Sequence, residues 1–399
     1  MKYNVLLIYS SQSALNGAFY RFYGNIVKEL NKKSFDITLY SCCLIADGCL
    51  ILNNYEKSIQ LPNKTKYFSY KNLAVLKKFI LSNRINVVLN LLLPNIDISI
   101  FILVLKRKCG FKVLNHIHSM PNVIKKNSNY ISYLLIKDDL TIKDRIKINN
   151  KYLFLLLLSI KEYFVNIFSY SVSDRVVLLS NRYVKEYLSV LLKKKSLKVL
   201  FAPNPFIMPS SLKIRPILER EKNIVFVGRI SKEKGVDLLL KIWIDFYAKH
   251  TEWNLIFVGS GDMFDFYKKN VLKYNICNVR FVGYQTNPFD FIVNARILCL
   301  TSIFEGLPSV ILEAMSVGTV PVCFDSFSAC YEMITNMFSG VIVPAFDIES
   351  YKRSLFLLAE NETLLASISD NALSEIEKYN LYNVVMKWNN IFNTLNSDV

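Results

Sequence analysis

Two basic residues follow a predicted strand and have the right chemistry to grip phosphate. Arg229 and Lys234 lie in the run 227–235, between the strand expected at 223–227 and the helix expected at 236–248. In an open α/β sheet, such loops present backbone N–H groups and a helix N-terminus to a ligand. An Arg fork and a Lys point charge can together neutralise a diphosphate without a metal ion. Two basic residues in one loop are equally typical of a solvated surface.

Two glutamates eight residues apart, Glu305 and Glu313, follow another predicted strand at 297–300. Gly306 permits a tight turn and Pro308 suits the first position of a helix, which puts Glu305 on the loop and Glu313 inside the helix. Glu305 is then placed to hold sugar hydroxyls, and Glu313 to accept both hydroxyls of a ribose. The N–H groups at the start of this helix, around Leu307 and Ser309, can meet phosphate oxygens. Taken alone, the pair also fits two unrelated surface acids.

The elements that must position these residues alternate along the whole chain. Short apolar or β-branched runs alternate with segments of helical period, which is typical of parallel, doubly wound sheets. We expect strands at 4–9, 36–40, 86–90, 112–117, 175–179 and 199–202 in the first half, and at 223–227, 254–258, 279–282, 297–300, 320–324 and 340–343 in the second. Two Rossmann-like domains follow from this alternation.

Punctuation by proline marks the boundary between the two domains. Residues 203–222 contain Pro203, Pro205, Pro209 and Pro216 among polar residues, which is typical of a linker. We therefore expect a first domain at 1–203, a linker at 204–222 and a second domain at 223–380. The remaining segment, 381–399, contains an amphipathic helix that is expected to pack back on the first domain.

The order and spacing of these features are more specific than any one of them. A strand followed by Gly228-Arg229-x4-Lys234-Gly235, then 257–262, then 279–284, then Glu305-x7-Glu313, all fall in the second half. In this the sequence resembles the family-four, group 1 glycosyltransferases of GT-B fold, including those that build bacterial cell-surface polysaccharide and lipopolysaccharide. The resemblance covers most of residues 200–345 and extends only loosely to the first half. It implies two Rossmann-like domains that face each other across a cleft.

The resemblance also implies roles for individual residues. Arg229 and Lys234 would contact the donor diphosphate, Glu313 the nucleotide ribose and Glu305 the transferred sugar, while Tyr284 would lie near the base. The implied donor-binding residues are Gly17, Gly228, Arg229, Lys234, Tyr284, Gly306, Leu307, Pro308, Ser309 and Glu313. The implied catalytic residues are Glu305, His118, Arg229 and Lys234. The reaction would retain the anomeric configuration and use no metal or other cofactor.

Two candidates belong to the first half. His116 and His118 end the strand at 112–117, and His118, followed by Ser119 and a loop proline, better matches the family histidine that contacts the donor sugar. One of the two histidines can instead cap the strand while the other packs in the core. Gly17 lies in the loop after the first strand, where the family has a Gly-Gly pair, so this sequence departs from the family pattern there.

Charge is distributed unevenly between the halves. Residues 1–200 contain 31 Lys and Arg against 11 Asp and Glu, whereas the remainder contains 18 against 21. A positive half attracts an anionic membrane surface or a nucleic acid, although a general bias toward Lys and Asn also explains it. Basic clusters at 106–108, 125–126, 143–147 and 193–195, with aromatics such as Tyr130, Tyr133 and Tyr152, could rest on anionic lipid. The leucine-rich run 153–158 could dip into a bilayer, but we interpret it as a buried helix.

These observations favour one function over two alternatives. We expect a cytoplasmic enzyme, peripheral on the inner face of the membrane, that transfers sugar from a nucleoside-diphosphate sugar to a glycan or lipid-linked acceptor. The eight cysteines contain no C-x-x-C pair, so no zinc-site spacing is present and reduced thiols are expected. A sugar-nucleotide epimerase is disfavoured by the Glu305-x7-Glu313 pattern. A non-catalytic protein that binds polyanions is disfavoured by dispersed basic residues and the lack of a nucleic-acid-binding signature.

Overall fold

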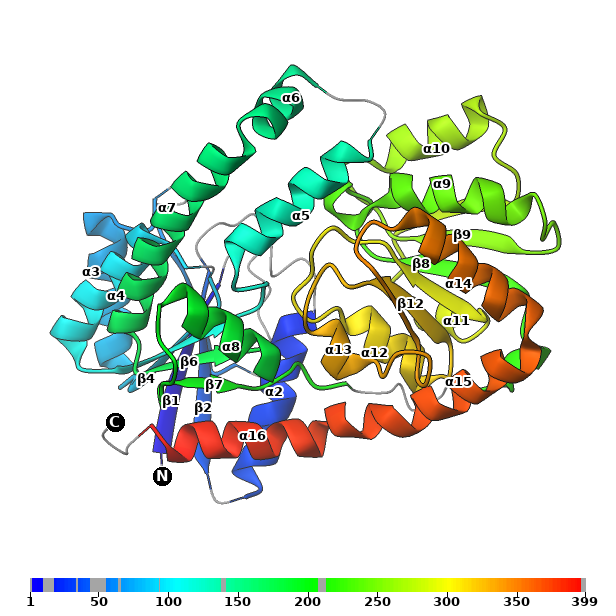
Figure 1. Cartoon of the computed structure of the whole chain (residues 1–399). Helices are drawn as coiled ribbons and strands as arrows, with labels where there is room; N and C mark the ends of the chain where they lie inside the picture. Colours follow the sequence, from blue (N-terminus) through cyan, green and yellow to red (C-terminus); the bar gives the residue numbers. More distant parts are fainter. Residues whose placement is uncertain are drawn as a thin grey trace. The chain divides into compact units, whose positions relative to one another are not determined.

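The computed structural model describes eight stretches of the chain. They are residues 2–9, 18–33, 35–43, 55–63, 66–92, 94–137, 141–206 and 213–395. The chain forms two compact units (Figure 1), each assembled from separate segments. The first unit contains Met1–Val123, Leu156–Pro205 and Asn380–Val399, and the second contains Ile124–Leu155 and Phe206–Tyr379. Residues 124–155, which the sequence analysis assigned to the first domain, thus lie in the second unit.

The first unit is built on a seven-stranded sheet with the order β3-β2-β1-β4-β5-β6-β7, and all its neighbouring strands are parallel. Its strands are β1 (Lys2–Tyr9), β2 (Asp36–Cys43), β3 (Lys57–Gln60), β4 (Val87–Asn90), β5 (Lys112–Ile117), β6 (Arg175–Leu178) and β7 (Val199–Phe201). Its helices are α2 (Ala18–Asn31), α3 (Tyr70–Ser82), α4 (Ile96–Cys109), α8 (Asn181–Val190), α16 (Leu381–Asn393) and most of α7 (Lys151–Val172).

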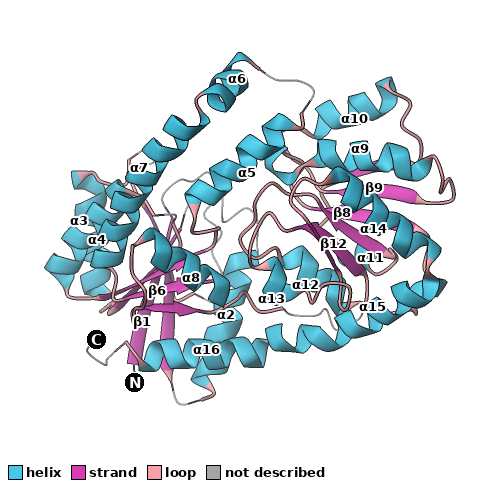
Figure 2. Ribbon diagram, in the orientation of Figure 1, coloured by secondary structure: helices cyan, strands magenta, loops and turns pink. Residues whose placement is uncertain are grey.

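Alternation along the first strand explains how this sheet is covered on both faces. Val5 and Leu7 belong to one hydrophobic cluster and Leu6 and Ile8 to another, because successive side chains of a strand point to opposite faces. The first cluster contains residues of α2 and α16, and the second contains residues of α3 and α4. Figure 2 shows the helices that supply these side chains. The C-terminal helix α16 therefore packs on the first unit.

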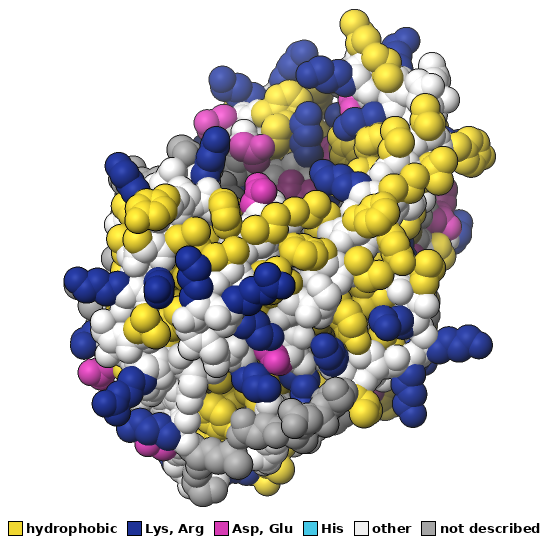
Figure 3. Space-filling model, turned by 90° about the vertical axis from the view of Figure 1, so that its left-hand side faces the viewer, with side chains coloured by type: hydrophobic (Ala, Val, Ile, Leu, Met, Phe, Trp, Pro, Cys, Tyr) yellow, Lys and Arg dark blue, Asp and Glu magenta, His cyan; other side chains and the backbone are white. Residues whose placement is uncertain are grey.

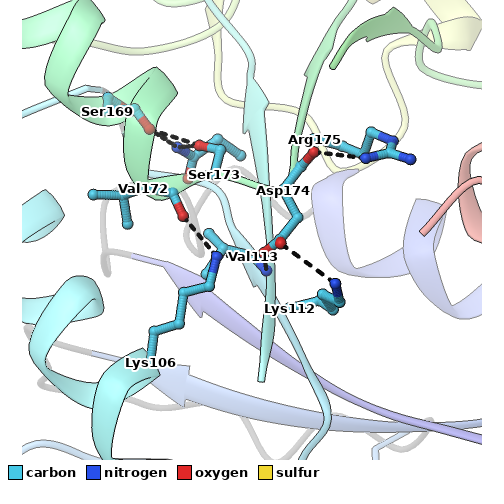
Figure 4. A network of polar contacts seen from close by, with 9 residues as sticks. Lys106, Lys112, Val113, Ser169, Val172, Ser173, Asp174 and Arg175 are labelled. Carbon is cyan, nitrogen blue, oxygen red and sulfur yellow. Dashed lines mark hydrogen bonds and ion pairs between the residues drawn. The ribbon is translucent and has the colours of Figure 1, made fainter. Parts of the chain in front are cut away.

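A polar network ties α4 and α7 to the sheet of the first unit (Figure 4). The Asp174 carboxylate accepts hydrogen bonds from Lys106 Nζ at 2.6 Å and from the Val113 N–H at 2.7 Å. Lys106 Nζ also donates to the Val172 carbonyl at 3.0 Å. Lys106 is therefore a structural cation, and the expectation that it faces lipid is wrong.

The second unit contains a six-stranded sheet with the order β10-β9-β8-β11-β12-β13, again parallel throughout. The strands are β8 (Asn223–Val227), β9 (Asn254–Val258), β10 (Val279–Gly283), β11 (Ile297–Leu300), β12 (Val320–Phe324) and β13 (Val341–Val343). The helices are α5 (Val123–Leu135), α6 (Ile142–Asn149), α9 (Val236–Tyr247), α10 (Phe264–Lys273), α11 (Phe289–Ile292), α12 (Ser309–Ser316), α13 (Cys330–Met333), α14 (Ile348–Glu360) and α15 (Glu362–Glu375). Three short 3₁₀ helices occupy Ile217–Glu219, Lys232–Lys234 and Ile376–Tyr379. The prediction of two parallel-sheet α/β domains is confirmed.

Two elements differ from the sequence-based expectation. The edge strand β3 was not predicted, because Lys57–Gln60 is short and mostly exposed and so has no apolar run. The leucine-rich segment 153–158 is helical, but the interpretation as a buried helix is wrong. It lies in α7, where Leu153, Leu156 and Leu157 are each more than half exposed.

Candidate functional site

Two loops of the second unit lie at the point where the strand order reverses. The central strands β8 and β11 are neighbours, and β9 continues the sheet on one side while β12 continues it on the other. Ligands of open α/β sheets bind beyond the carboxyl ends of strands at such a switch point. The loop 228–235 follows β8 and the loop 301–308 follows β11. The sequence-predicted basic pair and the first glutamate thus lie on adjacent loops.

Hydrogen bonds join these two loops along their backbones. The Ile303 N–H donates to the Glu233 carbonyl at 2.8 Å, and the Thr301 hydroxyl donates to the Gly235 carbonyl at 2.8 Å. Gly235 has a φ of 62°, and a Cβ there would lie 2.1 Å from the Thr301 carbonyl oxygen. Only glycine combines this left-handed backbone with so close an approach. The two loops therefore form one rigid edge.

Lys234 and Glu305 are paired across this edge. Lys234 Nζ lies 2.5 Å from Glu305 Oε1, and the side chains are only 20% and 10% exposed. The Ser302 hydroxyl donates to the same carboxylate oxygen at 2.7 Å. Glu305 is consequently held by a cation and a hydroxyl, both from the loops themselves. Sequence analysis did not single out Ser302, because a serine two residues after a strand carries no distinctive pattern.

Arg229 lies in a more open setting than Lys234. Its guanidinium pairs with the Glu233 carboxylate one turn along the loop, and its side chain is 64% exposed. An exposed pair of this kind contributes little to stability. Arg229 can therefore exchange the Glu233 carboxylate for another anion at a small cost in free energy.

The helix that carries Glu313 begins one residue later than expected. α12 starts at Ser309, and Pro308 occupies the N-cap position, where it makes no side-chain cap. The expectation that Pro308 takes the first helical position is corrected accordingly. Burial raises the pKa of Glu313, and a hydrogen bond with the Ser309 side chain partly offsets this rise. The Glu313 carboxylate is thus poorly solvated and favours hydrogen-bond donors from a ligand.

The glycines after β8 and β9 allow their loops to touch. A Cβ on Gly259 would lie 1.9 Å from the Gly228 carbonyl oxygen, while the Gly228 N–H donates to the Val258 carbonyl at 3.0 Å.

Tyr284 follows the edge strand β10, which β9 separates from β8, and it is 69% exposed. The structure leaves its side chain accessible at the margin of the switch point. Gly306 and Leu307 complete the loop between Glu305 and α12.

Helix α5 is a part of this site that sequence analysis missed. The Asn129 side-chain amide donates to the carbonyls of Ile303 at 3.2 Å and of Ser326 at 2.6 Å. The Tyr133 hydroxyl donates to Asp237 at 2.6 Å, and Tyr133 is 1% exposed. The expectation that Tyr133 rests on lipid is therefore wrong. The amphipathic pattern of 123–135 was visible in the sequence, but it does not say which sheet the helix covers.

The histidines of the first unit form a compact cluster at the end of β5. The Tyr23 hydroxyl lies 2.5 Å from His116 Nδ1 and 2.9 Å from His118 Nε2. Trp388 of α16 packs edge-on against both Tyr23 and His116. His116 is 2% exposed and His118 is half-buried. The structure thus brings the two candidate histidines together, with His118 the more accessible.

Burial keeps both histidines neutral. It lowers the pKa of His118 to about 3. It also moves the pKa of His116 well below its ordinary value, with the nearby His118 adding to the effect. The sequence alone left this protonation state open. Gly17, the remaining candidate of the first half, lies outside the described residues.

Within the part of the chain that the structure describes, no group of three or more acidic, histidine or cysteine side chains is placed to hold a metal ion. Two lysines supply positive charge near Glu305. Lys234 pairs with Glu305 directly, and the Lys126 ammonium lies over the ring of Phe304, the residue before Glu305.

Part of the chain is similar to one protein family and to several curated proteins. Residues 209–375 match the family model of the glycosyl transferases group 1. An uncharacterized glycosyltransferase of Haemophilus influenzae is 30% identical over 201 residues, which are 50% of this chain and 56% of that protein. The amylovoran biosynthesis glycosyltransferase AmsD of Erwinia amylovora is 25% identical over 232 residues, which are 57% of this chain and 65% of that protein. The chain thus spans less than two thirds of the length of these relatives.

Solved structures extend the similarity to the whole chain at the level of fold. The apo form of the lipopolysaccharide outer core galactosyltransferase WaaB matches with a TM-score of 0.70 and 18% identity, covering 99% of this chain and 100% of WaaB. Alr3699/HepE of Anabaena, in complex with UDP and glucose, matches with a TM-score of 0.69 and 13% identity, covering 98% and 100%. The chain therefore has the GT-B fold of these proteins, and its residues 209–375 match the family model of the group 1 glycosyl transferases.

Proposed function

We propose that this protein transfers a sugar from a nucleoside-diphosphate sugar to a hydroxyl of a glycan or lipid-linked acceptor, in the synthesis of a bacterial surface polysaccharide. We further propose that the reaction retains the anomeric configuration and needs no metal ion. The family of residues 209–375 supports the transfer of sugar. The functions for which AmsD and WaaB are named support a polysaccharide or lipopolysaccharide acceptor.

One observation carries the proposal, namely the Lys234–Glu305 pair on two hydrogen-bonded loops. Negative charge grows on the diphosphate when the glycosidic bond breaks, and a catalyst must stabilise that charge more than it stabilises the ground state. Lys234 would turn from Glu305 toward the diphosphate, and Arg229 would exchange Glu233 for it. Glu305, released from Lys234, would accept hydrogen bonds from the hydroxyls of the transferred sugar.

Glu313 fits the ribose of the donor. Burial raises its pKa, so the carboxylate gains most from ligands that donate hydrogen bonds. Two adjacent ribose hydroxyls supply two donors in a chelating arrangement. The N-terminal turn of α12, at Ser309, would face the phosphates, because the N–H groups at a helix start attract anions. His118 would contribute hydrogen bonds to a sugar as a neutral group.

The test is a thermal-shift screen of the full chain against UDP, GDP, ADP and CMP, with and without EDTA. A ligand at 100 times its Kd stabilises the folded state by about 2.7 kcal/mol. We expect one nucleoside diphosphate to raise the Tm, EDTA to change nothing, and Lys234→Ala and Glu313→Ala to abolish the shift. Lys232→Ala is the matched control, because Lys232 is an exposed neighbour in the same loop. No response of the wild-type protein to any nucleotide would contradict a transferase and favour a polyanion-binding protein.

Turnover distinguishes a transferase from an epimerase and tests stereochemistry. Once the donor base is known, incubation with the corresponding sugar nucleotides should release nucleoside diphosphate and the sugar with its anomeric configuration retained. Proton NMR during the first minutes reads the configuration before mutarotation. Release of an epimerised free sugar, or of the inverted anomer, would contradict the proposal.

We also propose that the chain works at the inner face of the cytoplasmic membrane, with α7 as its lipid-facing element. Among the described helices, α7 is the one long and apolar enough to span a bilayer by length and composition, with a mean hydropathy of 1.4. The distribution of polar and apolar side chains on α7 is the reverse of that on a surface helix of a soluble protein. The buried positions are Glu162, Asn166, Ser169 and Val172, whereas the exposed positions, apart from Lys161 and Ser171, are apolar.

The exposed face of α7 is continuous. Leu153, Leu156, Leu157, Ile160 and Phe164 follow helical spacing, and each is 48–59% exposed. Figure 3, seen from the left-hand side of Figure 1, shows hydrophobic side chains gathered among Lys and Arg side chains. An apolar helix face with cations nearby is typical of an element that lies in the interface of an anionic bilayer.

Sedimentation with vesicles tests this second proposal. The wild-type protein should sediment with phosphatidylglycerol vesicles at low salt and much less with phosphatidylcholine vesicles. The double variant Leu156→Glu/Leu157→Glu should stay in the supernatant, while Leu81→Glu, at an exposed position of α3, should sediment normally. Equal sedimentation of both variants would contradict a role for α7.

A further inference from the structure

Helix α5 carries Lys126, and packing alone does not account for the position of its ammonium group. Lys126, Asn129 and Tyr133 follow the spacing i, i+3, i+7 and so share one helix face. Asn129 and Tyr133 fasten this face to the loops of the second unit, through Ile303, Ser326 and Asp237. Tyr133 and Leu134 also belong to the hydrophobic core of that unit. Lys126 is therefore held over the same loops by two fixed neighbours.

Lys126 reaches the residue next to Glu305. Its Nζ lies 4.0 Å from the centre of the Phe304 ring, a distance at which a cation and an aromatic face attract each other. Burial lowers the pKa of Lys126, and Glu233 partly offsets the effect. Glu233, however, already pairs with Arg229. The Lys126 ammonium is thus partly removed from water, and among the described residues it forms no ion pair with a carboxylate.

The charges of the loop edge then do not balance. On the two loops together with Lys126, the positive charges are Arg229, Lys232, Lys234 and Lys126, and the negative ones are Glu233 and Glu305. A partly desolvated cation is costly unless an anion compensates it. A phosphate group is the anion that such a cluster fits, because Lys can donate to its oxygens from several directions. The adjacent Lys125, one residue away, lies on a different side of α5.

We propose that Lys126 is a third phosphate-binding cation of the donor site, brought to the loops of the second unit by α5. The inference rests on the proposed function, because it adds a residue to the same donor site. Lys126 supplies positive charge to the diphosphate beside Lys234 and Arg229, while the Phe304 ring contacts its ammonium group. The ring keeps the ammonium in place before the donor arrives, which reduces the ordering that binding requires.

Calorimetric titration of the full chain tests the role of Lys126. The ligands are the nucleoside diphosphate identified in the screen, the matching nucleoside and inorganic pyrophosphate. Lys126→Met keeps the length and apolar stem but removes the charge, and Lys126→Arg restores a charge. A lost hydrogen bond to a charged group weakens binding by about tenfold or more. We expect that loss for the diphosphate and for pyrophosphate in Lys126→Met, near wild-type binding in Lys126→Arg and in the control Lys125→Met, and no change for the nucleoside.

Three results would overturn the inference. One is wild-type affinity of Lys126→Met for the diphosphate, which would leave Lys126 as a packing residue only. Another is an equal loss for the nucleoside and the diphosphate, which a displaced α5 would produce. If Lys126→Met does not fold, the variant Phe304→Leu takes its place, because it removes the ring and keeps the lysine. The third contradicting result is a loss of nucleoside binding in Phe304→Leu.

The outcome is separable from the proposed function. A wild-type protein that binds the diphosphate, with loss in Lys234→Ala but not in Lys126→Met, supports the donor site and contradicts the role of Lys126. A wild-type protein that binds no nucleotide but binds pyrophosphate through Lys126 contradicts the transferase and supports the phosphate site. A wild-type protein that binds none of these ligands contradicts both.

Discussion

The carboxyl ends of the two sheets carry opposite kinds of polar group. In the second unit, Lys234 and Glu305 are ionised partners 2.5 Å apart on hydrogen-bonded loops. In the first unit, His116 and His118 surround the Tyr23 hydroxyl and are kept neutral by burial. The first arrangement suits an anion and the second suits hydroxyl groups. The same parallel-sheet architecture therefore prepares one edge for charge and the other for neutral hydrogen bonding.

The largest expected effect concerns the core behind the histidine cluster. Trp388 is 1% exposed and packs against Tyr23 and His116. Trp388→Ala should lower the free energy of unfolding of the first unit by about 3–5 kcal/mol, because it leaves a large cavity. Nucleotide affinity should not change, since Trp388 belongs to the other unit. Urea denaturation and nucleotide titration read the two quantities, and Met386→Ala, at an exposed position of the same helix, is the control.

The next effect lies at the charged edge. Lys234→Ala should lower the rate of sugar transfer by about 10²–10³-fold, as expected when one preorganised charge donor is removed from a transition state. Steady-state kinetics measures the loss, and Lys232→Ala should retain the wild-type rate. Unchanged kcat in Lys234→Ala would show that the ion pair with Glu305 is structural only.

A smaller effect tests whether the loops must touch. Gly235→Ala introduces a Cβ 2.1 Å from the Thr301 carbonyl at a backbone φ of 62°. We expect a loss of about 1–3 kcal/mol in the free energy of unfolding, together with weaker nucleotide binding. Gly110→Ala has a comparable φ of 76° but nothing within 4 Å of the added Cβ. A loss no larger than in that control would show that contact with Thr301 is unimportant.

Per pH unit, the smallest effect is a dependence of stability on pH that belongs to the neutral edge. The pKa of His118 is about 3 in the folded protein and about 6.5 in an unfolded chain. Between these values the unfolded state holds the extra proton, so stability falls as the pH drops, by about 1.4 kcal/mol per pH unit for this group. Above about pH 6.5 its contribution is fully present. His118→Asn should reduce the slope measured by urea denaturation at pH 4–7, and an unchanged slope would contradict a buried neutral His118.

Sequence reasoning reached the fold through the strands of the second unit. Runs such as 223–227 and 320–324 are continuously apolar because both faces of a parallel sheet are covered, and they match β8 and β12. The short polar strand β3 offers no such signal. The loops with Arg229, Lys234 and Glu305 could be located because they follow strands. The contact between Lys234 and Glu305 depends on β8 and β11 being neighbours, which a sequence order does not state.

Two parts of the site could not be predicted from a single sequence, for a physical reason. An amphipathic pattern says that one face of 123–135 is buried, but not that Tyr133 meets Asp237 of the second unit. Lys126 was grouped with Lys125 as a surface cluster, whereas the structure places it against Phe304. Likewise, the leucines of α7 were interpreted as buried because apolar residues usually are. The structure exposes them because this part of α7 is not covered: no residue of 151–161 is buried, and the first buried position of the helix is Glu162.

The assembly of each unit from separated segments has a consequence for biosynthesis. The core of the first unit includes Val384 and Trp388, which leave the ribosome after every residue of the second unit, whose last segment ends at Tyr379. Domains generally begin to fold as their chain emerges. The unit that starts the sequence must therefore wait, with its β strands already made, until α16 arrives. The second unit is the first whose core can be complete during translation.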